Sequence, residues 1–189
     1  MKKKLTALFF AVAAAFSLPV MAQDQDAQKA WMDYMTPGKF HEMMARDNGT
    51  WDAAISIWPA PGAQAMTSTG TIVYEMILGG RYQQMTFKGD MMGMPFEGIG
   101  TAAYDNVKKK FINTWMDNMG TGIMYLEGPW DEATKTIKLS GKQVEPVSGQ
   151  EITVRQTLQY INDNEQLMQS FTDYEGKEFK TMEIRFKRK

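Results

Sequence analysis

The 189-residue chain contains no cysteine and a single histidine, His41. Without cysteine it forms no disulfide, has no thiol nucleophile and offers no attachment point for a lipoprotein acyl group. One histidine also argues against zinc, because structural zinc takes four Cys or His ligands and catalytic zinc three protein ligands. We therefore expect no resident metal, no cofactor and a fold held by its apolar core alone.

A haem site or a nucleophilic catalytic site needs fewer special residues than a zinc site does. Haem needs one strong axial ligand, but His41 lies next to Glu42 in a short predicted helix, where a histidine is usually solvated or capping. The chain also has no Gly-x-Ser-x-Gly elbow for a serine nucleophile. We expect a structural role for His41 and, on balance, no enzymatic activity.

The chain has little net charge, with 21 Lys and Arg against 22 Asp and Glu. The two signs alternate along the sequence instead of forming a basic stripe, which a protein needs in order to displace counterions from phosphates. Residues 1–22 contain three lysines, at 2–4, and no acidic residue, so the chain without them has a net charge of −4. Nucleic acid is therefore excluded as a partner.

Residues 1–22 have the three parts of a cleavable export signal. Lysines at 2–4 precede an apolar stretch at 5–18, and Val20-Met21-Ala22 forms a cleavage site. As a helix, about 14 apolar residues rise only about 21 Å, less than the roughly 30 Å core of a bilayer. We expect cleavage after Ala22 and a soluble product in the periplasm or secreted medium, not integral to the membrane.

Turn residues divide the chain after Gly49 into segments of about ten residues, the spacing typical of antiparallel sandwiches and barrels. In the last segment Met182, Ile184 and Phe186 alternate with charged residues, as in a strand with one buried face. The segments are 50–58, 69–78, 81–88, 96–104, 110–117, 122–129, 134–140, 151–161, 166–174 and 179–188. They predict an all-β, about ten-stranded, antiparallel up-and-down barrel.

One or two short helices should precede the barrel. Five apolar residues share one helical face: Ala27, Ala30, Trp31, Tyr34 and Met35. The expected organisation is a signal peptide at 1–22, a helical segment at 23–47 and a barrel at 48–189.

Gly49-Thr50-Trp51 resembles the Gly-x-Trp signature of calycins, which include the lipocalins and fatty-acid-binding proteins. In those barrels the tryptophan closes one end of the lumen under a basic side chain of the last strand. Arg188 continues the inward face of Met182, Ile184 and Phe186, so the resemblance implies a barrel-end pair of Trp51 and Arg188.

The chain also resembles domain-of-unknown-function family 1579, whose bacterial, exported members are calycin-like. The resemblance spans residues 37–188 and rests on motifs that include Leu78-Gly79-Gly80-Arg81, Gly93-Met94-Pro95-Phe96-Glu97-Gly98 and Thr114-Trp115-x-Asp117. Ala103 stands where that pattern leads us to expect glycine. The resemblance implies a fold and no established reaction.

A calycin-like lumen would be lined by aromatic walls with a few polar groups that orient a ligand. The candidate pocket residues are Trp51, Tyr74, Arg81, Phe96, Glu97, Asn113, Trp115, Asp117, Tyr125, Gln156 and Phe186. Asp117 with Glu97 is a conceivable acid–base pair, although a buried carboxylate is more often paired structurally.

Seventeen methionines are many for this length, and spacings such as Met91-Met92-x-Met94 are compatible with thioether ligands for Cu(I). Packing of flexible side chains around an irregular lumen is the simpler interpretation.

The favoured hypothesis is an exported barrel that binds a small apolar or amphiphilic molecule. The alternative is an envelope protein-interaction or stress-related scaffold with a filled barrel, whose N-terminal helices make the contacts.

Overall fold

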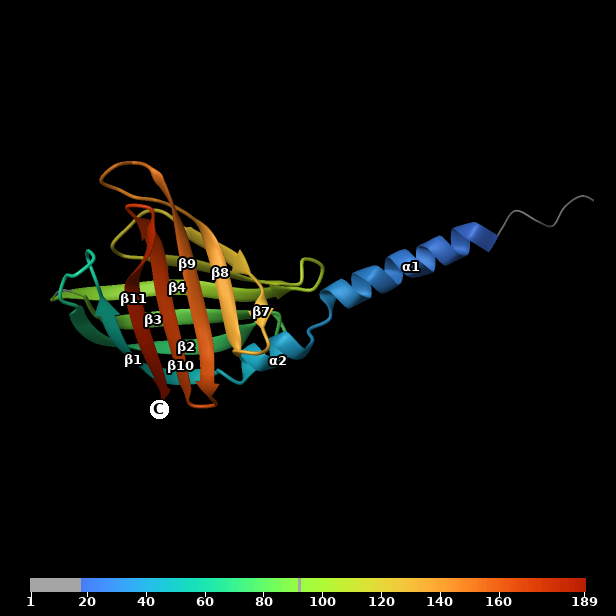
Figure 1. Ribbon diagram of the computed structural model, residues 1–189. Helices are drawn as coiled ribbons and strands as arrows, with labels where there is room; N and C mark the ends of the chain where they lie inside the picture. Colours follow the sequence, from blue (N-terminus) through green and yellow to red (C-terminus); the bar gives the residue numbers. More distant parts are fainter. Residues whose placement is uncertain (1–17, 92) are drawn as a thin grey trace, which may run out of the picture. The chain divides into compact units, whose positions relative to one another are not determined.

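The computed structural model describes residues 18–91 and 93–189 (Figure 1). Most of the expected signal peptide lies outside the described residues. Helix α1, Leu18–Met35, belongs to one compact unit, and a second unit begins at Thr36 with helix α2, Lys39–Ala45. Within the described chain, no helix combines the length and apolarity needed to cross a bilayer.

The second unit consists of strands after α2. The strands in its described residues are β1 (Gly49–Ile57), β2 (Met66–Ile77), β3 (Tyr82–Met91), β4 (Met94–Asp105), β5 (Lys110–Asp117), β6 (Met124–Gly128), β7 (Trp130–Asp131), β8 (Thr136–Val144), β9 (Glu151–Asn162), β10 (Glu165–Tyr174) and β11 (Lys177–Arg188). Each of the ten predicted segments coincides with one strand, with ends that differ by at most four residues. The predicted all-β fold is confirmed. The two-residue β7 was not expected.

The strands form a closed antiparallel barrel. Every neighbour in the series from β6 back to β1 and then from β11 back to β8 is hydrogen-bonded. A pairing of β6 with β8, through Glu127 and Ser140, closes the cylinder, and β7 pairs only with β8. Each hairpin joins adjacent strands, so no crossover helix is needed.

Two glycines let the backbones approach at the β6–β8 seam. A Cβ atom on Gly128 would lie 1.8 Å from the carbonyl oxygen of Lys138. A Cβ atom on Gly141 would lie 2.1 Å from the carbonyl oxygen of Tyr125. Any larger side chain here would collide with backbone, which cannot rotate away as a side chain can.

Alternation along the strands separates the interior from the exterior. In β11, Ile184 and Phe186 are buried, whereas Arg185 and Lys187 are exposed. The inward residues form two core clusters, one around Trp51 and one around Leu126.

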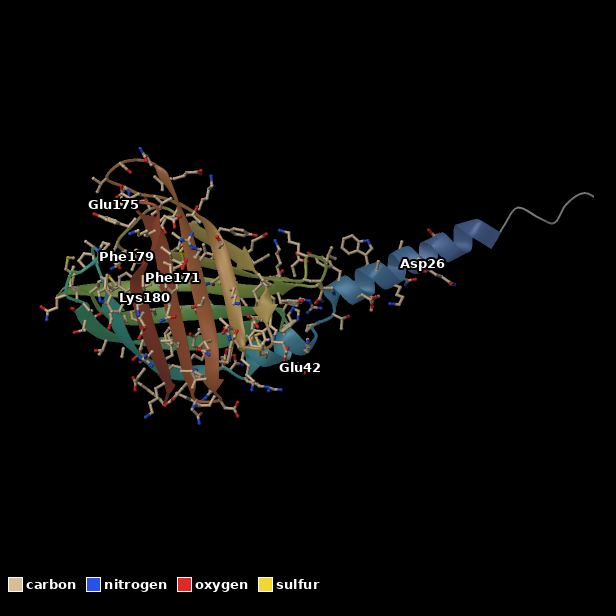
Figure 2. The ribbon with its side chains drawn as sticks, viewed as in Figure 1. Asp26, Glu42, Phe171, Glu175, Phe179 and Lys180 are labelled. Atoms are coloured by element: carbon tan, nitrogen blue, oxygen red, sulfur yellow. The ribbon has the colours of Figure 1, made fainter. Side chains whose placement is uncertain are left out.

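Helix α2 closes the barrel at the end where β1 begins. Met44 is buried in the second core cluster, and its carbonyl oxygen accepts a hydrogen bond of 2.7 Å from Gln83 Nε2 on β3. The Phe40 ring packs against Tyr104 and Phe111, with ring centroids 4.4 and 5.2 Å away. We call this the closed end. Figure 2 shows Glu42 on α2 at this end and Glu175 at the opposite one.

Candidate functional site

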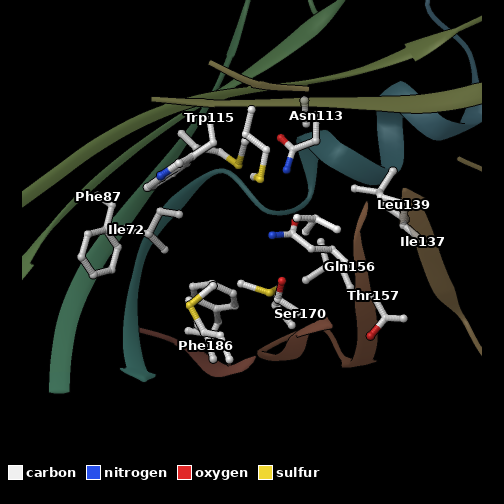
Figure 3. Close-up of a pocket in the computed structure, with 18 of the residues that line it drawn as sticks. Ile72, Phe87, Asn113, Trp115, Ile137, Leu139, Gln156, Thr157, Ser170 and Phe186 are labelled. Atoms are coloured by element: carbon white, nitrogen blue, oxygen red, sulfur yellow. The ribbon is translucent and has the colours of Figure 1, made fainter. Parts of the chain in front are cut away.

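A cavity of about 490 Å³ lies inside the barrel and is lined by side chains from both core clusters. Figure 3 shows part of this lining, with the aromatic rings of Phe87, Trp115 and Phe186 around the space. The lining extends from Met44 at the closed end to Met119 and Gln143 near the opposite strand ends. The barrel is therefore hollow along much of its length.

Seven methionines contribute to the lining: Met44, Met85, Met91, Met119, Met124, Met168 and Met182. They are distributed over the wall, where a flexible thioether fills irregular gaps between larger side chains. Met92, part of the spacing considered for copper, lies outside the described residues. Within the described chain, no three His, Cys, Asp or Glu side chains come together as a metal site.

Seven of the candidate pocket residues line the cavity: Tyr74, Phe96, Asn113, Trp115, Asp117, Gln156 and Phe186. They come from β2, β4, β5, β9 and β11, so the fold brings together residues far apart in the sequence. Trp51 is fully buried at the closed end and is not part of this lining.

The structure places the other three candidates outside the cavity. Glu97 follows the inward Phe96, so it points outward and lies 3.5 Å from Lys88 Nζ. Tyr125 likewise lies between inward neighbours, and its hydroxyl donates to Glu127 at 3.1 Å. Arg81 precedes β3 in a turn, where its guanidinium donates to the carbonyl oxygen of Leu78. Strict alternation would have excluded Glu97 and Tyr125.

Asp117 has partners of its own near the open strand ends. Its carboxylate accepts hydrogen bonds of 2.9 Å from Trp115 Nε1 and from the backbone N–H of Met119. Because Glu97 points to the other face of the sheet, the structure does not form the conceivable acid–base pair of Asp117 and Glu97.

Trp51 and Arg188 meet at the closed end. They are directly paired across β1 and β11, and the Arg188 Cζ atom lies 4.3 Å from the centroid of the indole ring. The guanidinium also donates to the carbonyl oxygens of Arg46, Asn48 and Asp163 at 2.6, 3.0 and 3.2 Å. Arg188 therefore connects the last strand to the end of α2 and to the β9–β10 turn.

Asp47, which the sequence analysis did not single out, is buried beside this pair. Its carboxylate accepts hydrogen bonds from Gln166 Nε2 at 2.8 Å and Tyr160 Oη at 3.0 Å. Its carbonyl oxygen accepts from Trp51 Nε1 at 2.8 Å. Burial raises the pKa of Asp47 to about 6, against the lowering effect of Tyr160 and Arg188. In the sequence Asp47 is one polar residue at a helix end, which gives no signal of burial.

A separate set of polar side chains lies in the middle of the cavity. Asn113 on β5 and Gln156 on β9 both extend into the interior (Figure 3). The Oδ1 atom of Asn113 is buried without a hydrogen-bond partner within the described chain. Gln156 is 7% exposed, and Ser170, its pairing partner on β10, is 5% exposed.

His41 is buried in α2 and does not line the cavity. Its Nδ1 atom accepts a hydrogen bond of 3.0 Å from the backbone N–H of Gly38, and burial lowers the pKa of the imidazole. The imidazole therefore caps the first turn of the helix.

Comparison with known proteins gives a family and a fold. The family model described as "Protein of unknown function (DUF1579)" matches residues 36–188. The crystal structure of Rv2717c from M. tuberculosis aligns with a TM-score of 0.59 at 11% identity, covering 82% of this chain and 99% of that chain. A redesigned β-barrel aligns at 13% identity over 77% of this chain and 94% of its own, with a TM-score of 0.41 that carries no further weight. No curated protein matches the chain.

The contacts of Arg188 predict a large effect of its removal. Arg188→Ala should lower the free energy of unfolding by about 2–4 kcal/mol, because a cation–π contact and several hydrogen bonds from a charged donor are lost. Arg185→Ala, on the exposed face of the same strand, should change it by less than about 1 kcal/mol. Urea denaturation of both variants measures the difference. Equal, small effects would contradict the assigned role of Arg188.

The raised pKa of Asp47 predicts a pH-dependent stability. A carboxyl with a folded pKa of about 6 and an unfolded pKa near 3.8 binds its proton more tightly in the folded state. Its contribution to stability is therefore complete below pH 3.8 and is lost as the pH rises through about 6. Relative to Asp47→Asn, the wild-type protein should lose on the order of 3 kcal/mol of unfolding free energy between pH 4 and pH 8.

The control is Asp52→Asn, since the Asp52 side chain is 65% exposed on the neighbouring strand β1. Its difference from wild type should change little over the same range. A wild-type minus Asp47→Asn difference that is constant with pH would show that Asp47 ionises normally in the folded protein.

Proposed function

Given that the chain belongs to family DUF1579, whose description assigns no function, we propose that the barrel binds one small, apolar or amphiphilic molecule in its cavity. The observation that carries the proposal is the hollow interior of about 490 Å³. Ligand pockets usually measure roughly 300–1,000 Å³ and combine apolar walls with a few polar groups. The cavity has this volume and this composition.

The lining favours an apolar or amphiphilic ligand over a strongly polar one. Aromatic rings and methionine side chains make up much of the wall, including Phe87, Trp115 and Phe186. Methionine side chains adapt to the shape of a bound molecule at low cost. Burial of an apolar ligand surface against them would contribute about 25 cal/mol per Å² before the costs of association.

The strand ends opposite α2 offer the route of entry. At the closed end, Trp51 and the aromatic contacts of Phe40 occupy the space below the cavity. At the other end the lining includes Phe171 and Thr181, and Figure 2 shows Phe171, Phe179 and Lys180 near this end. Lys180 Nζ lies 4.5 Å from the centroid of the Trp58 ring and 2.7 Å from Glu183 Oε2, and none of these three residues is part of the cavity lining.

Export completes the proposed function. The composition of residues 1–22 supports it, with a basic start, an apolar stretch and the Val20-Met21-Ala22 site. The match to the family begins at residue 36, after the expected cleavage site. The protein would then collect its ligand in the periplasm or the surrounding medium.

A protein-interaction role for α1 is a second candidate. Trp31, Tyr34 and Met35 are exposed on this helix, and exposed apolar side chains that lie together often mark a contact surface. The sequence-based form of this hypothesis required a filled barrel, which does not fit the cavity. A protein-interaction role of α1 would therefore exist alongside ligand binding in the barrel and would not replace it.

Partial filling of the cavity tests ligand binding. Ala102 lines the cavity and its neighbour Ala103 does not, so Ala102→Phe should weaken binding of the uncharged dye N-phenyl-1-naphthylamine at least tenfold. The wild-type protein should bind the dye in the micromolar range, with quenching of Trp115 fluorescence.

Ala103→Phe is the matched control and should leave the affinity within about twofold. Both variants are first checked for a cooperative thermal transition, so that loss of binding is not loss of folding. No dye binding by the folded wild-type protein would refute the proposed function, and equal affinities for all three proteins would place the dye elsewhere.

A further inference from the structure

We propose that the ligand is an uncharged amphiphile whose hydrogen-bonding group, a primary amide or a hydroxyl, is held in mid-cavity by Asn113 and Gln156. This inference rests on the proposed function and specifies the chemistry of its ligand. It follows from which charges the lining lacks, which acids are already paired, and which polar atoms have no partner.

The described lining of the cavity contains no lysine, arginine or histidine. A carboxylate or phosphate group that entered would lose its hydration without gaining a cationic partner, at a cost of several kcal/mol. The carboxylates that do line the cavity, Asp47 and Asp117, would repel it further. The lining therefore disfavours an anionic ligand such as a fatty acid.

Both acids of the lining are already hydrogen-bonded. Asp47 accepts from Gln166 and Tyr160, and Asp117 accepts from Trp115 and the backbone of Met119. Arg188 adds a positive charge near Asp47. A cationic ligand would have to compete with these partners, so the lining does not favour a cation either.

Two buried side-chain oxygens have no hydrogen-bond partner in the described chain, and one of them, Gln166 Oε1, belongs to a residue outside the lining. The other belongs to the lining. Asn113 Oδ1 is buried and has no partner in the described chain. No hydrogen bond of the Gln156 or Ser170 side chain to another described residue is present, and both residues are more than nine-tenths buried. A buried amide without a partner costs about 1–3 kcal/mol, so such groups in a folded protein call for an explanation.

A bound ligand supplies that explanation. Carboxamides both donate and accept, so Asn113 and Gln156 together match a ligand group that does the same without carrying charge. Once the Asn113 amide turns its oxygen toward the cavity, an N–H or O–H of the ligand would donate to Oδ1, and the ligand's oxygen would accept from an amide N–H. The apolar part of the ligand would lie against the methionines and rings of the wall.

The test compares four decyl compounds that share an alkyl chain and differ in the polar group: decanamide, decan-1-ol, decanoate and decylamine. Each displaces N-phenyl-1-naphthylamine from the full-length mature protein at pH 7.5. Decanamide and decan-1-ol should bind at least tenfold more tightly than decanoate. In Asn113→Leu, this preference, calculated with that variant's own affinity for the dye, should fall below threefold.

Thr114→Val is the control, because Thr114 is the neighbouring residue on β5 and is not part of the lining; it should keep the full preference. Asn113→Leu should be at least as thermally stable as the wild type, because it removes an unpartnered buried amide. Decanoate or decylamine as the tightest compound would overturn the inference and leave the proposed function intact. Absence of binding by all four compounds and by the dye would refute both.

Discussion

Closure of ten antiparallel strands into a cylinder is the constraint on which the rest of the molecule depends. A barrel of about eight strands is just wide enough for its own side chains or one small ligand to fill, and the interior widens as strands are added. This chain closes through the pairing of β1 with β11 and through a short seam between β6 and β8. The interior of a ten-stranded barrel is wide enough to leave a cavity. The strands alone do not determine whether each end of the barrel is closed or open.

The two ends of the barrel are built differently. At the closed end, α2, Trp51 and Arg188 form a network in which charged and aromatic groups fill the space. Asp47 is held there by Tyr160 and Gln166, in contact with the cavity. At the other end the strands join through turns, and Asp117 is the acid of the lining on that side. The neutral amides of Asn113 and Gln156 lie in the middle of the cavity. The kind of polar group therefore changes along the barrel axis, whereas the walls are apolar.

Much of this architecture can be predicted from the sequence, because a strand with one buried face has a period of two and its ends carry turn residues. Alternation in the last strand puts Ile184, Phe186 and Arg188 on one face, and the structure has Arg188 over Trp51. The same rule, applied more strictly, would have kept Glu97 and Tyr125 out of the pocket.

Other features could not be predicted because they depend on tertiary contacts. The β6–β8 seam requires two backbones to meet at Gly128 and Gly141. In the sequence, Gly128 lies inside a predicted strand segment and Gly141 directly after one, and neither indicates a close approach of strands. Burial of Asp47 depends on Tyr160 and Gln166, more than a hundred positions away. The lack of a cation in the cavity appears only once the fold shows which residues line it.

Native mass spectrometry of the protein purified from cells that produce and export it is the decisive test of ligand binding in the barrel. A binding protein should give a polypeptide mass for residues 23–189 together with one noncovalent adduct of a single small molecule that is lost on denaturation. A bare polypeptide in every gently purified preparation, also after incubation with a total lipid extract of those cells, would contradict the claim that the barrel is a binding protein.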